Sequence, residues 1–245
     1  CPLLGGFDEE LIHQPHDRCG LCHLFDVGFA RPGLAEHFDT VIGVADALIA
    51  MHEPTAGHDV VEDANQAFRR AADLFVTLAN ERRREPGADV LTSLVQVADG
   101  SDRLTNDELV ALAVILVVAG HETTANTLCT GMLHLLEDPE ALELLRADRS
   151  LLPTAVEELL RFDAATRNSV ARYALRDLEL GDVKIQKGER LFVSLHASNH
   201  DPAEFSDPNR LDITRDPNRH MGFGGGAHYC LGAALARMEL QVAIG

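Results

Sequence analysis

Tryptophan is absent from this chain of 245 residues, and aromatic residues of all kinds make up only 5% of it. The hydrophobic core therefore has to be built from leucine, valine and alanine. Apolar residues reach 46%, an ordinary share for a folded chain, so wholesale disorder is excluded. The length allows one large domain or two small ones.

Positive charge is scarce, because 21 Lys and Arg residues stand against 39 Asp and Glu residues, for a formal net charge of −18. Such a surface repels phosphate, which argues against nucleic acids and anionic membranes as partners. The longest apolar run, residues 109–120, is shorter than the ~20 residues that a membrane-spanning helix needs. A basic region followed by an apolar run, typical of a signal peptide, is not present at the start.

Five cysteines, an odd number in a chain of this size, do not indicate a disulfide framework and favour a reducing cytoplasm. The chain begins with Cys1 and not with methionine, which indicates processing or a fragment of a longer protein. Residues 1–28 show little periodicity and are left unassigned, whereas residues 29–245 are interpreted as one partial catalytic domain.

Helical periodicity dominates the first two thirds of this domain. Thr105 and Glu108 have the spacing of a capping box ahead of an apolar run, which predicts a long helix over about 106–136. After residue 169 short alternating segments predict strands joined by glycine turns, and residues 199–220 are expected to form an ordered loop. The expected fold class is mainly α with small β-sheets.

The most informative stretch is the loop 222–232, which reads Phe-Gly-Gly-Gly-Ala-His-Tyr-Cys-Leu-Gly from Phe223 onwards. Its glycines allow a tight turn and a close approach of the backbone to a flat ligand. Cys230 lies where this loop enters a helix expected to begin near Leu231. A helix N-terminus presents backbone N–H groups to the sulfur and favours a thiolate, which is a good axial ligand for iron.

This pattern resembles the haem-binding loop of the cytochrome P-450 superfamily, the haem-thiolate monooxygenases. The resemblance implies that Cys230 is the axial ligand of the iron of haem b and that His228 lies beside a haem propionate. It also implies the mainly helical cytochrome P-450-like fold, here incomplete and truncated at both ends. The matching positions are Phe223, Gly224, Gly226, His228, Cys230 and Gly232.

A second motif, Ala-Gly-His-Glu-Thr-Thr from Ala119, falls in the middle of the expected long helix. A glycine inside an apolar helix costs ~1 kcal/mol relative to alanine and suggests a close approach by another group. A mid-helix threonine can bond its own backbone and distort the helix. The motif resembles the oxygen-activating motif of the family. The resemblance implies that Gly120 lies over the haem, that Ala119 also belongs to the cofactor site, and that Glu122 and Thr123 deliver protons to bound dioxygen.

Glu158 and Arg161 lie three residues apart, a spacing whose ion pair is common and worth only ~0.2–0.5 kcal/mol on a helix surface. Here it resembles the Glu-x-x-Arg element of the family, which pairs with an arginine of the loop before the cysteine. Arg210 matches that loop position, and the three residues are expected to have a structural role.

Two further residues are candidates for the haem propionates. Arg172 precedes an expected strand in a way that resembles the propionate-binding arginine of the family, and a guanidinium suits a carboxylate geometrically. His220, just ahead of the glycine loop, is a weaker candidate for the same region.

The N-terminal segment contains a cluster of His13, His16, Cys19, Cys22 and His23. The last three fit the Cys-x-x-Cys-His pattern of covalent haem attachment, and the cluster also imitates a zinc site. Both patterns are short, so chance matches are frequent.

The resulting hypothesis is a haem-thiolate monooxygenase in the cytoplasm. It would take electrons from a ferredoxin or flavodoxin-type partner and insert one oxygen atom of dioxygen into an apolar small molecule. One alternative is a truncated, non-catalytic relative that binds haem poorly or not at all. Another is a metal-binding protein or c-type haem electron carrier that uses Cys19, Cys22 and His23.

Overall fold

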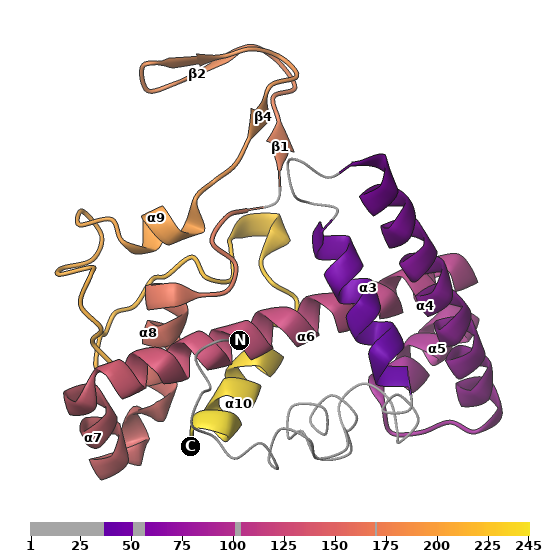
Figure 1. Ribbon diagram of the computed structural model, residues 1–245, viewed down its shortest axis with the longest axis horizontal. Coiled ribbons are helices and arrows are strands. Elements are labelled where there is room, and N and C mark those ends of the chain that lie inside the picture. The colour runs from indigo at the N-terminus through magenta and orange to yellow at the C-terminus, as the bar shows by residue number, and fades with distance from the viewer. Residues whose placement is uncertain (1–36, 51–56, 101–103, 170) are drawn as a thin grey trace. The chain divides into compact units, whose positions relative to one another are not determined.

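A computed structural model describes residues 37–50, 57–100, 104–169 and 171–245 of the chain. The expectations for residues 1–28 and for the cluster between His13 and His23 lie outside the described residues. The described part is mostly helical and holds two small antiparallel sheets (Figure 1), which confirms the expected fold class. It divides into two compact units, residues 1–122 and 123–245, and each is described by itself.

The first unit is a helical cluster around an apolar core. It contains α3 (Phe38–Ala50), α4 (His58–Arg84), α5 (Val90–Gly100) and the first part of α6 (Asn106–Glu137). Small and branched side chains fill its centre, as expected for a chain poor in aromatic residues. The deeply buried residues include Val44, Ala71, Phe75, Leu91, Leu109, Ala113, Val114 and Val117.

Helix α6 begins as the capping box predicts. The Glu108 carboxylate accepts from the Thr105 backbone N–H at 2.8 Å, and the Thr105 hydroxyl accepts from the Glu108 N–H at 3.2 Å. Two otherwise unpaired donors of the first turn are thereby satisfied. The observed span of Asn106–Glu137 confirms the predicted helix, and the helix continues without a break through the threonines where a distortion is expected.

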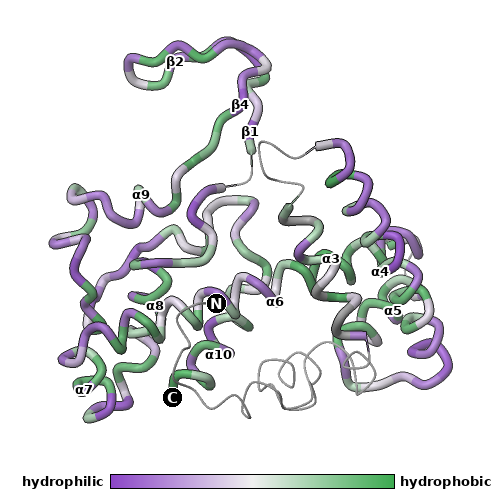
Figure 2. Tube along the Cα trace, viewed as in Figure 1, coloured by the Kyte–Doolittle hydropathy of each residue, from purple (hydrophilic) through white to green (hydrophobic). Residues whose placement is uncertain are grey.

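By length and composition alone, α6 could cross a membrane, with a mean hydropathy of 1.5 in its most apolar window. The run 109–120 is too short by itself, but the helix that contains it extends from Asn106 to Glu137 (Figure 2), which corrects the expectation drawn from the run alone. A buried core helix passes the same test, and 33% of this window of α6 is buried. Its residues Leu109, Val110, Ala113, Val114 and Val117 are buried within the first unit.

The second unit holds the rest of α6 and the shorter helices α7 (Pro139–Ala147), α8 (Leu152–Asp163), α9 (Leu195–Asn199) and α10 (Ala233–Ile244). The 3-10 turns η3 (Arg149–Leu151) and η4 (Gly226–His228) lie between them. Asp138 caps α7 by accepting from the Ala141 N–H at 3.0 Å, with Pro139 in the first turn. Helices α8 and α10 share an apolar contact made by Val156, Leu160 and Leu240.

Four short strands form the two sheets. Strand β1 (Arg172–Tyr173) pairs with β4 (Arg190–Leu191), and β2 (Leu178–Leu180) pairs with β3 (Val183–Ile185). The turns contain Gly181 and Gly188 at φ 57° and 89°, a backbone region that favours glycine. The loop expected over residues 199–220 follows α9 and carries the chain to the cysteine-bearing segment.

Candidate functional site

The loop before α10 is closed by its own backbone hydrogen bonds. The Cys230 N–H donates to the Phe223 carbonyl at 3.0 Å, and the Gly224 N–H donates to the Met221 carbonyl at 2.8 Å. Gly224 and Gly226 adopt φ values of 70° and 67°, which a side chain would strain. The glycines predicted to allow a tight turn therefore occupy the positions where the backbone requires them.

Cys230 presents its thiol at the surface of this loop. Free cysteine is among the residues most often buried in proteins, so an exposed one on a closed loop is available for ligation or chemistry. Helix α10 begins at Ala233 and not near Leu231, because Gly232 is its N-cap residue. The first N–H of the helix donates to the Cys230 carbonyl at 3.3 Å, so the helix start fixes the cysteine backbone.

The second motif lies on α6 at the boundary of the two units. Glu122 is the last residue of the first unit, and Thr123 is the first residue of the second, where its side chain is exposed. The next residue, Thr124, is buried and is hydrogen-bonded to the buried carboxyl of Glu239 on α10. Burial raises the pKa of Glu239, and the bond from Thr124 opposes this change in part. Thr124 and Glu239 thus connect α6 to the helix that follows Cys230.

The Glu158 cluster, which consists of Glu158, Arg161, Arg215 and Asn218, is buried as a unit. Arg161 and Glu158 have fully buried side chains and form a two-pronged ion pair with N···O distances of 2.7 and 2.8 Å. Arg161 also donates to the carbonyls of Asn199 and Pro208, both at 2.8 Å. The ion pair therefore fixes the long loop 199–220 from inside, which agrees with the expected structural role.

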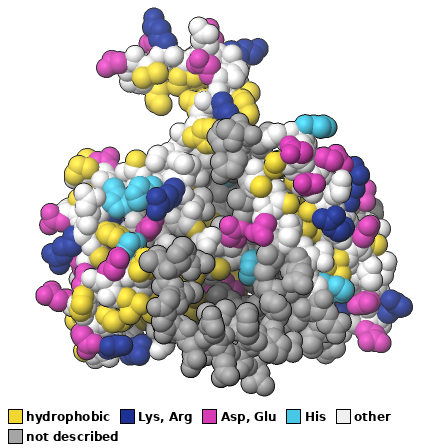
Figure 3. Space-filling view, in the orientation of Figure 1, with side chains coloured by type: hydrophobic (Ala, Val, Ile, Leu, Met, Phe, Trp, Pro, Cys, Tyr) yellow, Lys and Arg dark blue, Asp and Glu magenta, His cyan; other side chains and the backbone are white. Residues whose placement is uncertain are grey.

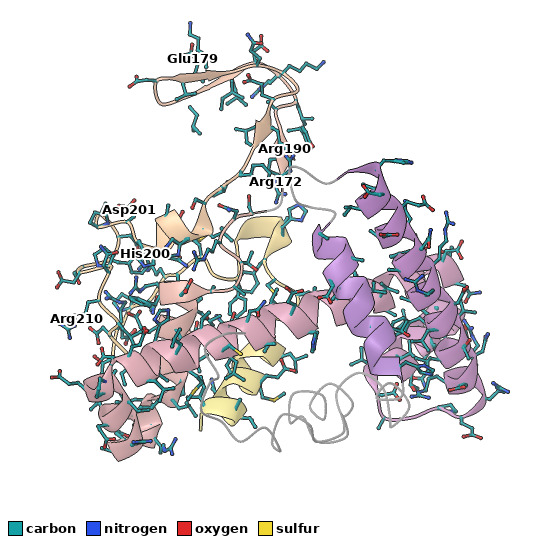
Figure 4. All side chains as sticks on the ribbon, viewed as in Figure 1. Arg172, Glu179, Arg190, His200, Asp201 and Arg210 are labelled. Atoms are coloured by element: carbon teal, nitrogen blue, oxygen red, sulfur yellow. The ribbon has the colours of Figure 1, made fainter. Side chains whose placement is uncertain are left out.

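The loop arginine of this cluster is Arg215 and not Arg210, which corrects the sequence assignment. The Arg215 Nε donates to Glu158 at 3.1 Å, whereas Arg210 contributes only its backbone carbonyl, which accepts from Arg161 at 3.2 Å. The Arg210 side chain is exposed at the outer edge of the loop (Figure 4). The two arginines lie five positions apart in one irregular loop, where no periodicity shows which of them faces inward.

The structure also corrects the expectation for His220. Its Nδ1 accepts from the Gly222 N–H at 3.0 Å, so the ring proton lies on Nε2, which donates to Glu157 at 2.9 Å. The side chain is only 3% exposed. Because both ring nitrogens are bonded within the protein, His220 supports the loop and is not placed to bind a propionate.

Arg172 and His228, the remaining propionate candidates, are both exposed. Arg172 lies on β1, where it pairs in register with Leu191, and Figure 4 shows it at the base of the β1–β4 ribbon. His228 ends the 3-10 turn η4, two residues before the cysteine. Among the described residues, no group of three or more His, Cys, Asp or Glu side chains is arranged to hold a metal ion.

Comparison with known proteins identifies the family to which the chain belongs. The family model for Cytochrome P450 matches residues 34–245, and the chain belongs to this family. Nocardicin C N-oxygenase of Nocardia uniformis subsp. tsuyamanensis is 48% identical over 180 residues, which cover 73% of this chain and 45% of that protein. Cytochrome P450 107B1 of Saccharopolyspora erythraea is 44% identical over 180 residues, which cover 74% of this chain and 44% of that protein.

Solved structures agree with this assignment. P450BioI, crystallised with an acyl carrier protein ligated to hexadec-9Z-enoic acid, matches with a TM-score of 0.83 at 36% identity, covering 91% of this chain and 57% of that chain. This chain spans about half the length of the curated relatives that it matches. The suspected relationship to the cytochrome P-450 superfamily is therefore confirmed for the part of the protein that the chain contains.

The residues of the loop fit the haem that the family binds. A thiol is the donor that defines a haem-thiolate centre, and here it is exposed on a loop closed by the Cys230–Phe223 and Gly224–Met221 backbone hydrogen bonds. A Cβ added at Gly226 would meet no atom within 4 Å, so the loop backbone is open at this glycine.

Five residues that sequence reasoning missed take part in this site and its support. No sequence pattern distinguishes Glu157 or Glu239, because a glutamate within a helix is ordinarily exposed to solvent. Arg215 and Asn218 lie in an irregular loop, and Arg237 resembles any surface arginine of a helix. Only the contacts of these side chains separate them from their neighbours in the sequence.

Proposed function

We propose that the chain is the catalytic portion of a haem-thiolate monooxygenase of bacterial type, formed by residues 29–245, with haem b held by the Cys230 thiolate. The observation that carries this proposal is the exposed thiol on a loop fixed by the Cys230–Phe223 hydrogen bond. Bound haem supplies the activation of dioxygen, and a thiolate ligand favours cleavage of the O–O bond. The protein contributes the ligand, the proton path and the apolar surroundings.

The residues of the chain have distinct roles in this proposal. Cys230 binds the iron, and the glycines at 224 and 226 allow the loop backbone to approach the haem plane. The guanidinium of Arg172 pairs with the propionates, for which a planar, charged donor is suited, and the imidazole of His228 lies beside them. On α6, Glu122 and Thr123 hold and pass protons toward the oxygen-binding side, next to the small residues Ala119 and Gly120.

The substrate class proposed is an apolar small molecule. Relatives of this chain include 6-deoxyerythronolide B hydroxylase of Saccharopolyspora erythraea and vitamin D(3) 25-hydroxylase of Pseudonocardia autotrophica, whose names describe hydroxylation. Electrons are proposed to come from a ferredoxin or flavodoxin-type protein, and the reaction is placed in the cytoplasm. Figure 3 shows the face on which acidic and basic side chains are interspersed among the described residues.

The test is the reduced, carbon-monoxide-bound difference spectrum of the purified chain with added haem. We expect the long-wavelength Soret band of a thiolate-bound haem, and Cys230→Ala should abolish it. Cys129→Ala is the matched control, because Cys129 is also a free, exposed cysteine and its removal should leave the band unchanged. Equal bands in wild type and Cys230→Ala would overturn the ligand assignment, and no bound haem would favour the non-catalytic alternative.

A second experiment tests the proton path. Thr123→Ala should lower the amount of oxygenated product formed per electron consumed, because the hydroxyl no longer helps to deliver protons. The ratio of product to electrons, measured with a surrogate ferredoxin and reductase, should be unchanged by Thr130→Ala farther along the same helix. Unchanged coupling in Thr123→Ala would contradict the role given to Thr123.

A further inference from the structure

The side chain of Glu157 collects three hydrogen bonds from two parts of the chain that flank the cysteine loop. Arg237 on α10 donates to both carboxylate oxygens at 2.6 and 2.8 Å, and His220 donates to Oε2 at 2.9 Å. A two-pronged, charge-assisted pair fixes the relative orientation of its partners as well as their distance. Glu157 therefore ties α8 to α10 and to the start of the loop.

Arg237 carries this connection to the far end of the loop. Its Nη1 donates to the Tyr229 hydroxyl at 3.1 Å, next to Cys230 in the sequence. Its guanidinium lies 4.5 Å from the centre of the Phe223 ring, within the range of a cation–π contact. Phe223 is the residue whose carbonyl accepts the Cys230 N–H, so one arginine contacts both flanks of the hydrogen bond that closes the loop.

The start of the loop is held from a second direction. The Gly222 N–H donates to Nδ1 of His220, the same ring whose Nε2 is bonded to Glu157. A Cβ at Gly222 would lie 2.9 Å from the Leu160 carbonyl oxygen on α8, so the loop passes directly against that helix. The imidazole thus connects the Glu157 carboxylate to the backbone of Gly222, one residue before Phe223, whose carbonyl accepts the closing bond.

Burial and charge favour a charged Glu157 in this arrangement. Burial by itself raises the pKa of the carboxyl, but the bonds from His220 and Arg237 outweigh it and lower the pKa to about 2. The pair with Glu157 raises the pKa of Arg237 above its ordinary value, although burial opposes that change. The Glu157 cluster is defined as Glu157, His220, Tyr229 and Arg237. Within it, Glu157 and Arg237 stay ionised over the physiological range.

We propose that Glu157, His220 and Arg237 are positioning residues that hold the Phe223 carbonyl, and through it the Cys230 backbone, in a fixed place between α8 and α10. The part of this inference that concerns iron rests on the proposed function. The part that concerns the order of the loop does not, because it follows from the contacts of the protein alone. The contacts of the three side chains are with the loop around the cysteine, so they act through the loop.

The first test measures hydrogen exchange at the Cys230 amide in the chain without haem. Glu157→Gln and Arg237→Met should each accelerate this exchange at least about tenfold relative to wild type, because each removes a charge-assisted bond. Glu143→Gln is the matched control, since Glu143 forms an exposed ion pair with Arg146 at 2.7 Å on α7 and should change nothing at Cys230. Arg237→Lys should give partial rescue, because an ammonium keeps the charge without the fork.

The second test measures the state of the sulfur after haem is added. At equal haem content, Glu157→Gln and Arg237→Met should shift a share of the carbon monoxide band from the thiolate position to shorter wavelength. Tyr229→Phe, which removes one bond, should have the smallest effect. A merely structural role would lower the melting temperature without changing this ratio.

Two results would overturn the inference. One is wild-type exchange at the Cys230 amide in folded Glu157→Gln, or in folded Arg237→Lys if Arg237→Met does not fold. The other is an unchanged thiolate share at equal haem content. If the wild-type chain takes up no haem, the proposed function fails, and the exchange experiment still decides the positioning role.

Discussion

The tetrapeptide Glu-Leu-Leu-Arg occurs twice in this chain, once with its charged side chains exposed and once with them buried. On α7 it runs from Glu143 to Arg146, whose side chains are 68% and 59% exposed and meet at 2.7 Å. On α8 it runs from Glu158 to Arg161, whose side chains are both 0% exposed and also meet at 2.7 Å. The residues and their spacing are the same, but one hydrogen bond joins the pair on α7 and two join the pair on α8, and the two pairs differ most in their surroundings.

The surroundings decide the energy of each pair. The exposed pair on α7 is screened by water, and pairs of this kind contribute ~0–1 kcal/mol. The pair on α8 has lost its water and replaced it with backbone carbonyls and with the side chains of Arg215 and Asn218. A buried pair is not a strong source of stability as a whole, but the loss of one partner leaves an uncompensated charge.

The largest expected effect on stability comes from breaking the buried ion pair of Glu158 and Arg161 on α8. Arg161→Met should lower the free energy of unfolding by ~3–5 kcal/mol, because Glu158 would then be buried without its main partner. The loop 199–220 should become sensitive to proteolysis, since Arg161 holds its carbonyls. Denaturant unfolding followed by circular dichroism measures the change, and a loss below about 1 kcal/mol would contradict the account of the buried cluster.

Gly222, which packs against the buried tetrapeptide on α8, gives the next largest expected effect on stability. Gly222→Ala would place a Cβ 2.9 Å from the carbonyl oxygen of Leu160, within the motif on α8. Overpacking of this kind should destabilise the protein by ~1–3 kcal/mol. Gly43→Ala is the matched control, because a Cβ there meets nothing within 4 Å, and it should stabilise α3 by ~0.5–1 kcal/mol. Thermal unfolding of both variants should therefore show shifts of opposite sign.

Glu157, the residue before the buried Glu158, is expected to make the stability of the protein depend on pH. The pKa of Glu157 is lowered to about 2, below its ordinary value of 4.5, so its stabilisation is complete above pH ~5 and is lost as the pH falls toward 2. Glu157→Gln should be less stable than wild type by ~1–2 kcal/mol at pH 7, and this gap should narrow by pH 3. Denaturant titrations at both pH values measure the gap, and a gap that stays constant would contradict the assignment.

The smallest effect is expected in the exposed copy. Glu143→Gln should cost only ~0.2–0.5 kcal/mol, and high salt should reduce the loss further because the pair is exposed. The free energy of unfolding lost in this variant, compared with that lost in Arg161→Met, measures how much the tertiary environment changes the contribution of the same tetrapeptide. A cost above 1 kcal/mol for Glu143→Gln would mean that α7 contributes more than its contacts indicate.

Much of the fold could be predicted from local signals. The capping box at Thr105 and Glu108 placed the start of α6, because the motif satisfies backbone donors of its own helix. The loop 222–232 was informative because its glycines and its cysteine stand at fixed offsets. The choice of Arg210 over Arg215 was wrong, because the direction of a side chain in an irregular loop depends on distant residues.

The sequence by itself determined the family, the helical character of the chain and the cysteine of the loop, since these depend on residue types at short, fixed spacings. The tertiary structure alone decided which Glu-Leu-Leu-Arg copy is buried, which arginine joins it and how Glu157 contacts Arg237, 80 positions away in the chain. The physical reason is that the worth of an ion pair depends on the water and charges around it. Those surroundings are assembled only when distant segments pack together.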